Sequence, residues 1–304
     1  MADQLSSTIL QMLPQATTIV DLQSYRPGYL PYPARVTLQT KTGKTMVCVL
    51  KTSTDRDQIV YEAQVLQALA DLDLPVPTVL AGPVTISTEQ EPLTLLLLSE
   101  LPGEPLPWIA LNDLDAAYRT CQLVTEAVDA LHVLTPHVLA HPISALIPTR
   151  TLKSELEMIR AREGAWFATP QFAAAFALVE RVLPQLDSPL VFSNGDYNPL
   201  NFLVADDALV GWIDFEHACF EDPYIGFAKF LLWADDAYGW GAGAKAGLVE
   251  RYLYEHQIAP TDFLGRLVLR GLRHVQETSP ENPPNYMLQV IAGGVQRLKS
   301  LLDE

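Results

Sequence analysis

The sequence predicts an α+β fold, with a small N-terminal lobe of antiparallel strands and one helix, followed by a larger, mainly helical lobe. Two observations predict it. The first hundred residues contain several β-prone runs and a single helix pattern. After the break at Pro102-Gly103, helical periodicity dominates. The length of 304 residues, 49% of them apolar, suits two cores better than one. We therefore expect two domains, 1–101 and 102–304.

The elements of the N-terminal lobe follow from periodicity and turn residues. An amphipathic helix pattern within the first fifteen residues comes before the first strand pattern. Thr42-Gly43-Lys44 lies between two strand patterns, which is typical of a hairpin. Pro75 and Pro77 end the helix pattern. The strands are expected at 17–25, 34–41, 45–51, 84–88 and 93–99, and the helix at 55–72. The last strand lacks alternation, which predicts burial on both faces.

The second lobe is predicted from helical spacing of apolar residues. Helices are expected at 112–134, 151–163, 170–185, 223–235, 243–256, 261–276 and 285–302. A strand-rich segment, 189–215, interrupts them. It contains a short strand, a polar loop at 193–201 and a hairpin that ends at Asp214.

Composition excludes several classes of function. The net charge of −16 argues against nucleic acid and anionic membrane surfaces as partners. No apolar run reaches the roughly 18–20 residues of a membrane-spanning helix, and the N-terminus has no basic start like that of a secretory signal. The three cysteines form no CxxC pair, so we expect buried thiols in a cytoplasmic protein. Acidity is compatible with a cationic small molecule.

Three oxygen-bearing side chains mark the strand-rich segment as a candidate site. Asp196 and Asn201 lie in its polar loop, and Asp214 follows its hairpin. A carboxylate and a carboxamide suit Mg²⁺, which prefers oxygen ligands, and a further carboxylate can deprotonate a hydroxyl. The alternative is ordinary turn chemistry, because Asp and Asn also bond to their own backbone.

The same stretch resembles the aminoglycoside phosphotransferases and their choline-kinase-like relatives. Their His-Gly-Asp-x-x-x-x-Asn loop corresponds to Asn194-Gly195-Asp196 and Asn201, their Ile-Asp-Trp/Phe-Glu to residues 213–216, and their Asp-Pro motif to residues 222–228. The resemblance implies a protein-kinase-like two-lobe fold and a small-molecule kinase that uses ATP or GTP with Mg²⁺. It assigns Asp196 as catalytic base and Asn201 and Asp214 as metal ligands.

The resemblance extends to the N-terminal lobe and implies that this lobe binds the nucleotide. Lys51, at a strand end, matches the phosphate-contacting lysine, and Glu62 matches the helix glutamate that pairs with it. The Ser99 carbonyl and the Leu101 amide match the groups that bind the base. His132 matches a family histidine, which we interpret as structural.

The sequence departs from the family pattern at three places. Ser24 to Ala34, where a Gly-rich loop is expected to cover the phosphates, has one glycine and three prolines. Asn194 replaces the family histidine, and Gly226 replaces the second aspartate of the Asp-Pro motif. Since both family residues brace the catalytic loop, we hypothesise that the two changes are linked and that Asn194 forms other hydrogen bonds.

The acceptor is left open among aminoglycosides, other antibiotics, choline, sugars and amino alcohols. Nine acidic residues against one basic residue between Asp196 and Asp236 hint at a cationic acceptor. Candidate contacts are Glu221, Trp233, Asp235, Asp236, Tyr238 and Trp240. A nucleotide-binding pseudokinase with a regulatory role is the main alternative. A protein kinase fits less well, because the short interval between Asp214 and Pro223 leaves no room for a substantial activation segment. The oligomeric state is not predicted.

Overall fold

A computed structural model describes residues 2–25, 33–89, 91–106, 114–161, 169–183, 186, 188–232, 247–278 and 285–303. The chain divides into two compact units. The first comprises residues 1–104, 137–146 and 202–218, and the second comprises 105–136, 147–201 and 219–304. The expected domains, 1–101 and 102–304, stay a prediction. The first unit takes in two later segments, one of which carries the hairpin that leads to Asp214.

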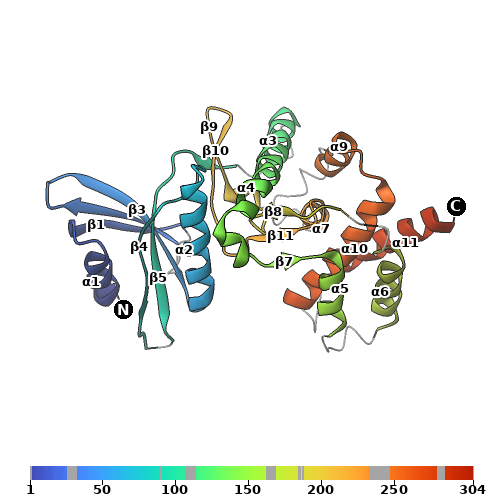
Figure 1. Cartoon of the computed structure of the whole chain (residues 1–304), viewed down its shortest axis with the longest axis horizontal. Helices are drawn as coiled ribbons and strands as arrows, with labels where there is room; N and C mark the ends of the chain where they lie inside the picture. Colours follow the sequence, from blue (N-terminus) through green and yellow to red (C-terminus); the bar gives the residue numbers. More distant parts are fainter. Residues whose placement is uncertain are drawn as a thin grey trace. The chain divides into compact units, whose positions relative to one another are not determined.

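The first unit contains an antiparallel five-stranded sheet in the order β1-β2-β3-β5-β4. Its strands are β1 (Ala16–Ser24), β2 (Ala34–Thr40), β3 (Thr45–Ser53), β4 (Val79–Ile86) and β5 (Leu93–Ser99). Helices α1 (Ala2–Met12) and α2 (Arg56–Asp71) lie on opposite sides of this sheet (Figure 1). Because both faces are covered, β5 has six consecutive buried residues, Leu93 to Leu98, as its lack of alternation predicts.

A second, three-stranded sheet contains the hairpin that precedes Asp214, which belongs to the first unit. It pairs β6 (Glu104–Pro105), β9 (Phe202–Ala205) and β10 (Ala208–Trp212) in the order β10-β9-β6. The β9–β10 turn consists of Asp206 and Asp207, whose φ angles are +50° and +59°. Positive φ at both central residues is the geometry that two-residue hairpins favour, and aspartate tolerates it better than most residues do.

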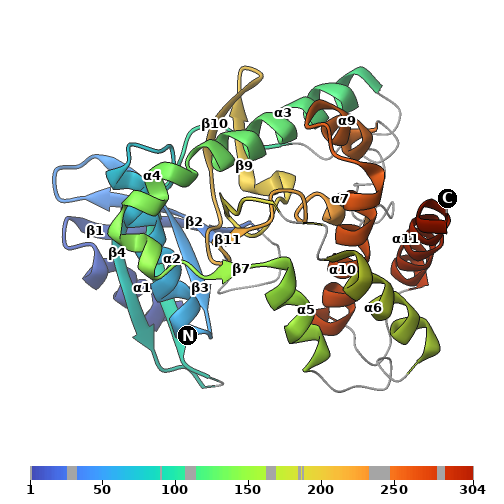
Figure 2. The same ribbon diagram turned by 45° about the vertical axis from the view of Figure 1, so that its right-hand side comes forward.

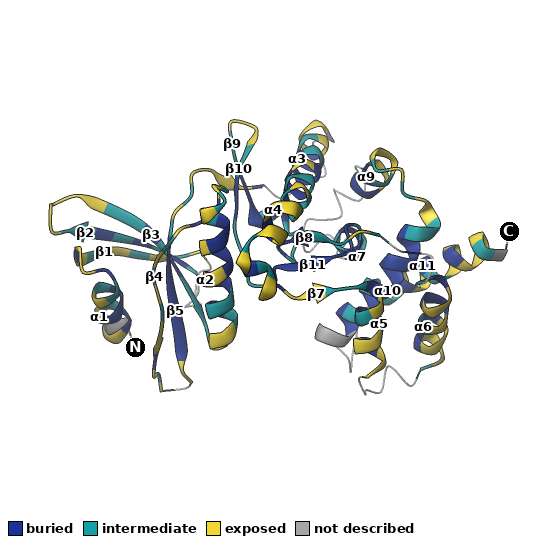
Figure 3. Cartoon of the chain, in the orientation of Figure 1, coloured by how far each residue is buried: buried dark blue, intermediate teal, exposed yellow. Residues whose placement is uncertain are grey.

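The second unit is mainly helical around a small sheet, β7 (Thr149–Arg150), β11 (Cys219–Glu221) and β8 (Val191–Ser193), in the order β7-β11-β8. Its helices are α3 (Leu114–Val133), α5 (Leu152–Arg160), α6 (Pro170–Val182), α7 (Ala228–Leu232), α9 (Leu248–Glu255), α10 (Pro260–Thr278) and α11 (Asn285–Asp303). Helix α10 packs against α5, α6, α7 and α11 (Figure 2). Most of the α10 surface is buried (Figure 3).

The expected α+β class is confirmed, and so are most of the long elements. Helix α7 begins at Ala228 rather than at residue 223, because Pro223 to Phe227 form turns whose first amides are bonded by the Asp222 carboxylate. Six short elements in the described part of the chain were not predicted: α4 (Thr135–Ala140), the 3₁₀ turns Pro142–Ala145 and Pro199–Asn201, β6, β7 and β11. The three cysteines are buried and reduced, as expected. Among the described helices, none combines the length and the apolarity that crossing a membrane requires.

Candidate active site

Lys51 lies among three carboxylates in the first unit. It projects from β3, and its Nζ lies 2.9 Å from Oε1 of Glu62, 2.6 Å from Oδ1 of Asp214 and 2.9 Å from Oε2 of Glu216. Burial by itself would lower the pKa of Lys51, but the carboxylates of Glu62, Asp214 and Glu216 raise it above its ordinary value. Lys51 is therefore a fixed positive charge.

Local structure explains how Glu62 reaches Lys51. The N-cap Asp55 accepts hydrogen bonds from the amides of Asp57 and Gln58 and so fixes the start of α2. Glu62 then falls on the buried face of α2 and is only 1% exposed. Its Oε1 also accepts a hydrogen bond from the amide of Phe215, 3.2 Å away. Glu62 thus positions both the lysine and the segment that carries Asp214.

Asp214 has a backbone conformation that is uncommon for a residue with a side chain. Its φ angle is +67°, in the left-handed region that costs a non-glycine residue energy. Such strain persists where surrounding contacts hold the backbone in place, here the Phe215–Glu62 hydrogen bond and the Asp214–Lys51 ion pair. Backbone strain of this kind clusters at functional sites.

The carboxylates around Lys51 provide the oxygen donors that a hard cation needs. Glu62, Asp214 and Glu216 each offer an oxygen, and these atoms lie within 4.8 Å of one another. Since Mg²⁺ prefers carboxylate oxygens, phosphate oxygens and water, this donor set fits Mg²⁺. Sequence reasoning did not select Glu216 as a ligand, although its position two residues after Asp214, in the same motif, was a usable signal.

Ser99 and Leu101 lie at the end of β5. The Ser99 amide donates to the Thr78 carbonyl at 2.9 Å, and the Ser99 hydroxyl accepts from the Thr78 amide at 2.8 Å. These bonds fix the strand end. Leu101 lies beside Gly211 of β10, where a Cβ would come within 2.9 Å of Leu101 Cδ1 and 2.8 Å of the Pro75 carbonyl oxygen. Glycine is therefore required at position 211, where the Leu101 side chain and the Pro75 backbone approach closely.

The polar loop of the second unit, residues 193–201, holds Asp196 by its backbone and by its side chain. Asn194 is fully buried, and its carboxamide both accepts from the Asp196 amide at 3.2 Å and donates to the Asp196 carbonyl at 3.0 Å. Asn201 donates to the same carbonyl at 3.1 Å. The Asp196 carboxylate forms an ion pair with Lys229 of α7. Both asparagines therefore stabilise the loop that presents this carboxylate.

Tyr197 connects the loop to helix α3. Its ring is buried, and its hydroxyl lies 2.8 Å from Nε2 of His132 on α3. A Cβ at position 226 would come within 2.2 Å of the Tyr197 ring, so Gly226 is what leaves room for the tyrosine. Burial, with repulsion from His256, lowers the pKa of His132 to about 3 and keeps this histidine neutral.

Comparisons with known proteins identify the family. Residues 33–265 match the family described as "Phosphotransferase enzyme family". The chain belongs to this family. The expectation of a phosphotransferase is thereby confirmed. A search of curated proteins found no match.

Solved structures of phosphotransferases share the fold of this chain. Aminoglycoside phosphotransferase APH(4)-Ia is 15% identical, with a TM-score of 0.67 over 100% of this chain and 99% of that one. A mutant of aminoglycoside 2'-phosphotransferase-IIIa, in complex with GDP, is 16% identical, with a TM-score of 0.59 over 98% and 96%. Macrolide 2'-phosphotransferase MphH from Brachybacterium faecium is 19% identical, with a TM-score of 0.51 over 92% and 99%. The kinase-like fold class that the sequence predicts is confirmed.

In this phosphotransferase, Asp222 of the Asp-Pro motif joins α10 to the turns before α7. Its carboxylate accepts from Nε and Nη2 of Arg266, both at 2.7 Å, and from the amides of Tyr224 and Ile225. The side chains of Asp222 and Arg266 are each 2% exposed. A bidentate pair with further hydrogen bonds is the arrangement in which a buried ion pair is tolerated.

The described residues account for the two substitutions in the family pattern. Asn194 bonds within the loop, and the Tyr197 ring fills the space that a side chain at Gly226 would need. The other hydrogen bonds expected of Asn194 are thus present, and the link between the two substitutions stays a hypothesis. Most of the segment from Ser24 to Ala34 lies outside the described residues, as do the acceptor candidates Trp233, Asp235, Asp236, Tyr238 and Trp240. The remaining candidate, Glu221, is buried on β11.

Proposed function

We propose that this protein is a small-molecule kinase that transfers the γ-phosphoryl group of ATP or GTP to a hydroxyl group of its acceptor. The observation that carries the proposal is Lys51, held by a buried glutamate beside Asp214 in a chain of a phosphotransferase family. A lysine fixed in this way gives phosphates a positive charge that needs no rearrangement during the reaction.

Each proposed role follows from the chemistry of the residue. Asp196 orients the acceptor hydroxyl and accepts its proton. The Ser99 carbonyl and the Leu101 amide bind the base of the nucleotide. Asp214 and Asn201 would hold Mg²⁺, and the oxygens around Lys51 suggest Glu216 as a further ligand. When bound, Mg²⁺ neutralises charge on the phosphates. The protein otherwise contributes positioning and electrostatics.

Structures of related enzymes support a nucleotide and a small-molecule acceptor. A mutant of APH(4)-Ia was crystallised as a ternary complex with AMP-PNP and hygromycin B; it is 15% identical to this chain, with a TM-score of 0.63 over 99% of this chain and 98% of that one. The proposal extends the same two ligand classes to this protein, with ATP or GTP as the nucleotide. A cytoplasmic location, expected from the sequence, belongs to the same proposal.

The Asp196→Ala variant tests the assignment. We expect transfer to fall by about 100-fold or more, since general base catalysis typically contributes 10²–10⁴-fold, while AMP-PNP binds with unchanged affinity. Nucleotide consumption is measured with a panel that contains an aminoglycoside, a macrolide, choline and a sugar. Glu157→Gln, which removes an exposed charge on α5, is the control.

Two results would reject the proposal. Near-normal turnover by Asp196→Ala would remove Asp196 from the reaction. Nucleotide binding by the wild-type protein without consumption, whatever the acceptor, would instead favour the pseudokinase.

A further inference from the structure

Arg35 and Glu100 form an ion pair at the end of the five-stranded sheet where the nucleotide base is proposed to bind. Nε of Arg35 lies 2.6 Å from Oε1 of Glu100, and Nη2 lies 3.3 Å from Oε2. Glu100 lies between Ser99 and Leu101, whose backbone groups are proposed to bind the base. Because two nitrogens of Arg35 are bonded to one carboxylate, the plane of the guanidinium is fixed.

Arg35 shares a face of the sheet with Lys51. Residues that pair directly across antiparallel strands point to the same face. Arg35 of β2 pairs with Val49 of β3, and Val49 pairs with Leu98 of β5. Lys51 lies two residues beyond Val49 on β3 and therefore points to the same face. Arg35, Val49 and Leu98 thus form a row of side chains beside Lys51.

The opposite face of the sheet is core. Cys48 and Leu97, which alternate with the residues of this row, lie in one hydrophobic cluster with Leu5 and Ile9 of α1. The Arg35 side chain, in contrast, is 39% exposed. A ligand that meets the sheet near the end of β5 therefore lies on the face that carries Arg35.

The row lies between the groups proposed to bind the two ends of a nucleotide. Ser99 pairs with Cys48, three residues before Lys51 on β3, which is about 10 Å at the rise of a strand. A nucleotide with its base at the end of β5 and its phosphates at Lys51 consequently passes over Arg35 and Val49. The base then lies close to the guanidinium.

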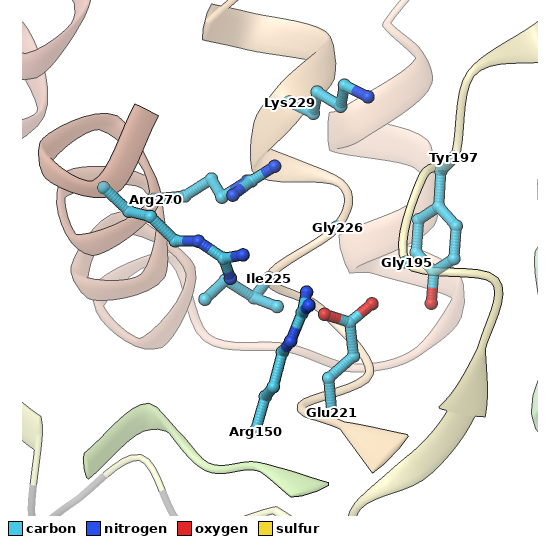
Figure 4. Close-up of a pocket in the computed structure, with 9 residues that line it drawn as sticks. Arg150, Gly195, Tyr197, Glu221, Ile225, Gly226, Lys229 and Arg270 are labelled. Carbon is cyan, nitrogen blue, oxygen red and sulfur yellow. The ribbon is translucent and has the colours of Figure 1, made fainter. Parts of the chain in front are cut away.

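A pocket in the second unit offers no alternative place for the base. It lies between β7, β11, α7 and α10, beside the loop that carries Asp196 (Figure 4). This pocket has room for about one water molecule, far less than a purine requires.

We propose that Arg35, held by Glu100, stacks on the base of the bound nucleotide. The inference rests on the proposed function, because it takes Lys51 as the residue that meets the phosphates. A guanidinium is planar and weakly hydrated and stacks on aromatic faces, and every base has such a face. Glu100 is a positioning residue, since it orders the guanidinium before the nucleotide binds and so reduces the entropy that binding costs.

Stacking does not read the edge of a base. Arg35 therefore favours ATP and GTP alike, and the choice between them is left to the backbone groups of Ser99 and Leu101.

Comparison of nucleotides with tripolyphosphate tests the stacking. AMP-PNP, GMP-PNP and tripolyphosphate each have three phosphorus groups, so a general change in the charge of the site largely cancels in the ratio of their dissociation constants. Calorimetry in the presence of Mg²⁺ gives the ratio of the tripolyphosphate constant to the nucleotide constant. We expect Arg35→Met to lower this ratio about tenfold for both nucleotides.

Three further variants separate stacking from charge. Arg35→Lys retains the positive charge without the plane and should lower the ratio as Arg35→Met does. Glu100→Gln should lower it severalfold, because the guanidinium is no longer held by a carboxylate. Arg251→Met, which breaks a similarly exposed arginine–glutamate pair on α9, should leave the ratio unchanged.

The outcomes distinguish this inference from the proposed function. Nucleotide binding with a wild-type ratio in Arg35→Met would overturn the stacking role alone. A loss confined to one nucleotide would overturn it too, since Arg35 would then read the edge of one base. A full ratio in Glu100→Gln would overturn the positioning role of Glu100. A wild-type protein that binds neither nucleotide nor tripolyphosphate would overturn the proposed function together with this inference.

Discussion

His132 connects pH with folding. Burial and the nearby His256 lower its pKa to about 3, whereas an unfolded histidine titrates near pH 6.5. Between these two values the unfolded chain binds a proton that the folded chain does not. The stability associated with neutral His132 is therefore fully present above pH 6.5 and is lost as the pH falls toward 3.

His132→Gln tests this dependence. Between pH 7 and pH 4.5 we expect the wild-type free energy of unfolding to fall by about 2–3 kcal/mol more than that of the variant, because the variant has no imidazole to protonate. Urea denaturation at a series of pH values gives both curves. His137→Gln, at an exposed histidine, should follow the wild type. Parallel curves for wild type and His132→Gln would contradict the assignment.

At the same scale, sequence patterns locate the charged residues better than their partners. Lys51 and Glu62 were matched through the family pattern, and the structure places them in contact. The ion pair between Asp196 and Lys229 was not foreseen, since it joins a loop to a helix 33 positions later. Neither was the hydrogen bond between Tyr197 and His132, across 65 positions. Spacing alone does not encode contacts between distant elements.

At the scale of elements, the loop at residues 193–201 packs tightly against the turn before α7, where Tyr197 meets Gly226. Tyr197 occupies the volume that any side chain at Gly226 would need. We expect Gly226→Ala to destabilise the protein by about 1–3 kcal/mol through overpacking, and to lower turnover because the tyrosine must move. When Tyr197→Ala is already present, the same substitution should cost clearly less, since the conflicting ring is gone.

Urea denaturation of the four proteins in this double-mutant cycle measures the coupling. Gly293→Ala on α11 is the matched control, because a Cβ there would meet no atom within 4 Å. In a helix that substitution should be neutral or stabilising by up to about 1 kcal/mol. Additive effects at positions 226 and 197 would show that the tyrosine does not require the glycine.

At the scale of the whole molecule, local patterns predicted the long elements, and long-range pairing decided the rest. The apolar run of β5 and the capped helix α2 contain their own signals. Strands β7 and β11 are two and three residues long and exist because each pairs with a distant segment. The composition of the units is non-local for the same reason, since 202–218 belongs with the N-terminal sheet.

In the proposed reaction, Lys51 binds the phosphates of the nucleotide. A bound nucleotide should therefore stabilise the fold, and this stabilisation should depend on Lys51. At a nucleotide concentration 100 times the dissociation constant, binding to the folded state adds about 2.7 kcal/mol. For a chain of this size that is a rise of about 4 °C in Tm. We expect the rise with AMP-PNP and Mg²⁺ together, and a smaller one with AMP-PNP and a chelator, because Mg²⁺ shields the phosphates from the carboxylates around Lys51.

Lys51→Met should abolish this rise. The substitution removes the positive charge that binds phosphate and leaves three carboxylates, which repel it. Lys153→Met, at an exposed lysine of α5, should retain it. Differential scanning calorimetry of each variant, with and without ligand, separates a change in binding from a change in intrinsic stability. An undiminished rise in Lys51→Met would mean that the nucleotide binds without the lysine, and the role proposed for the Lys51 cluster would have to be abandoned.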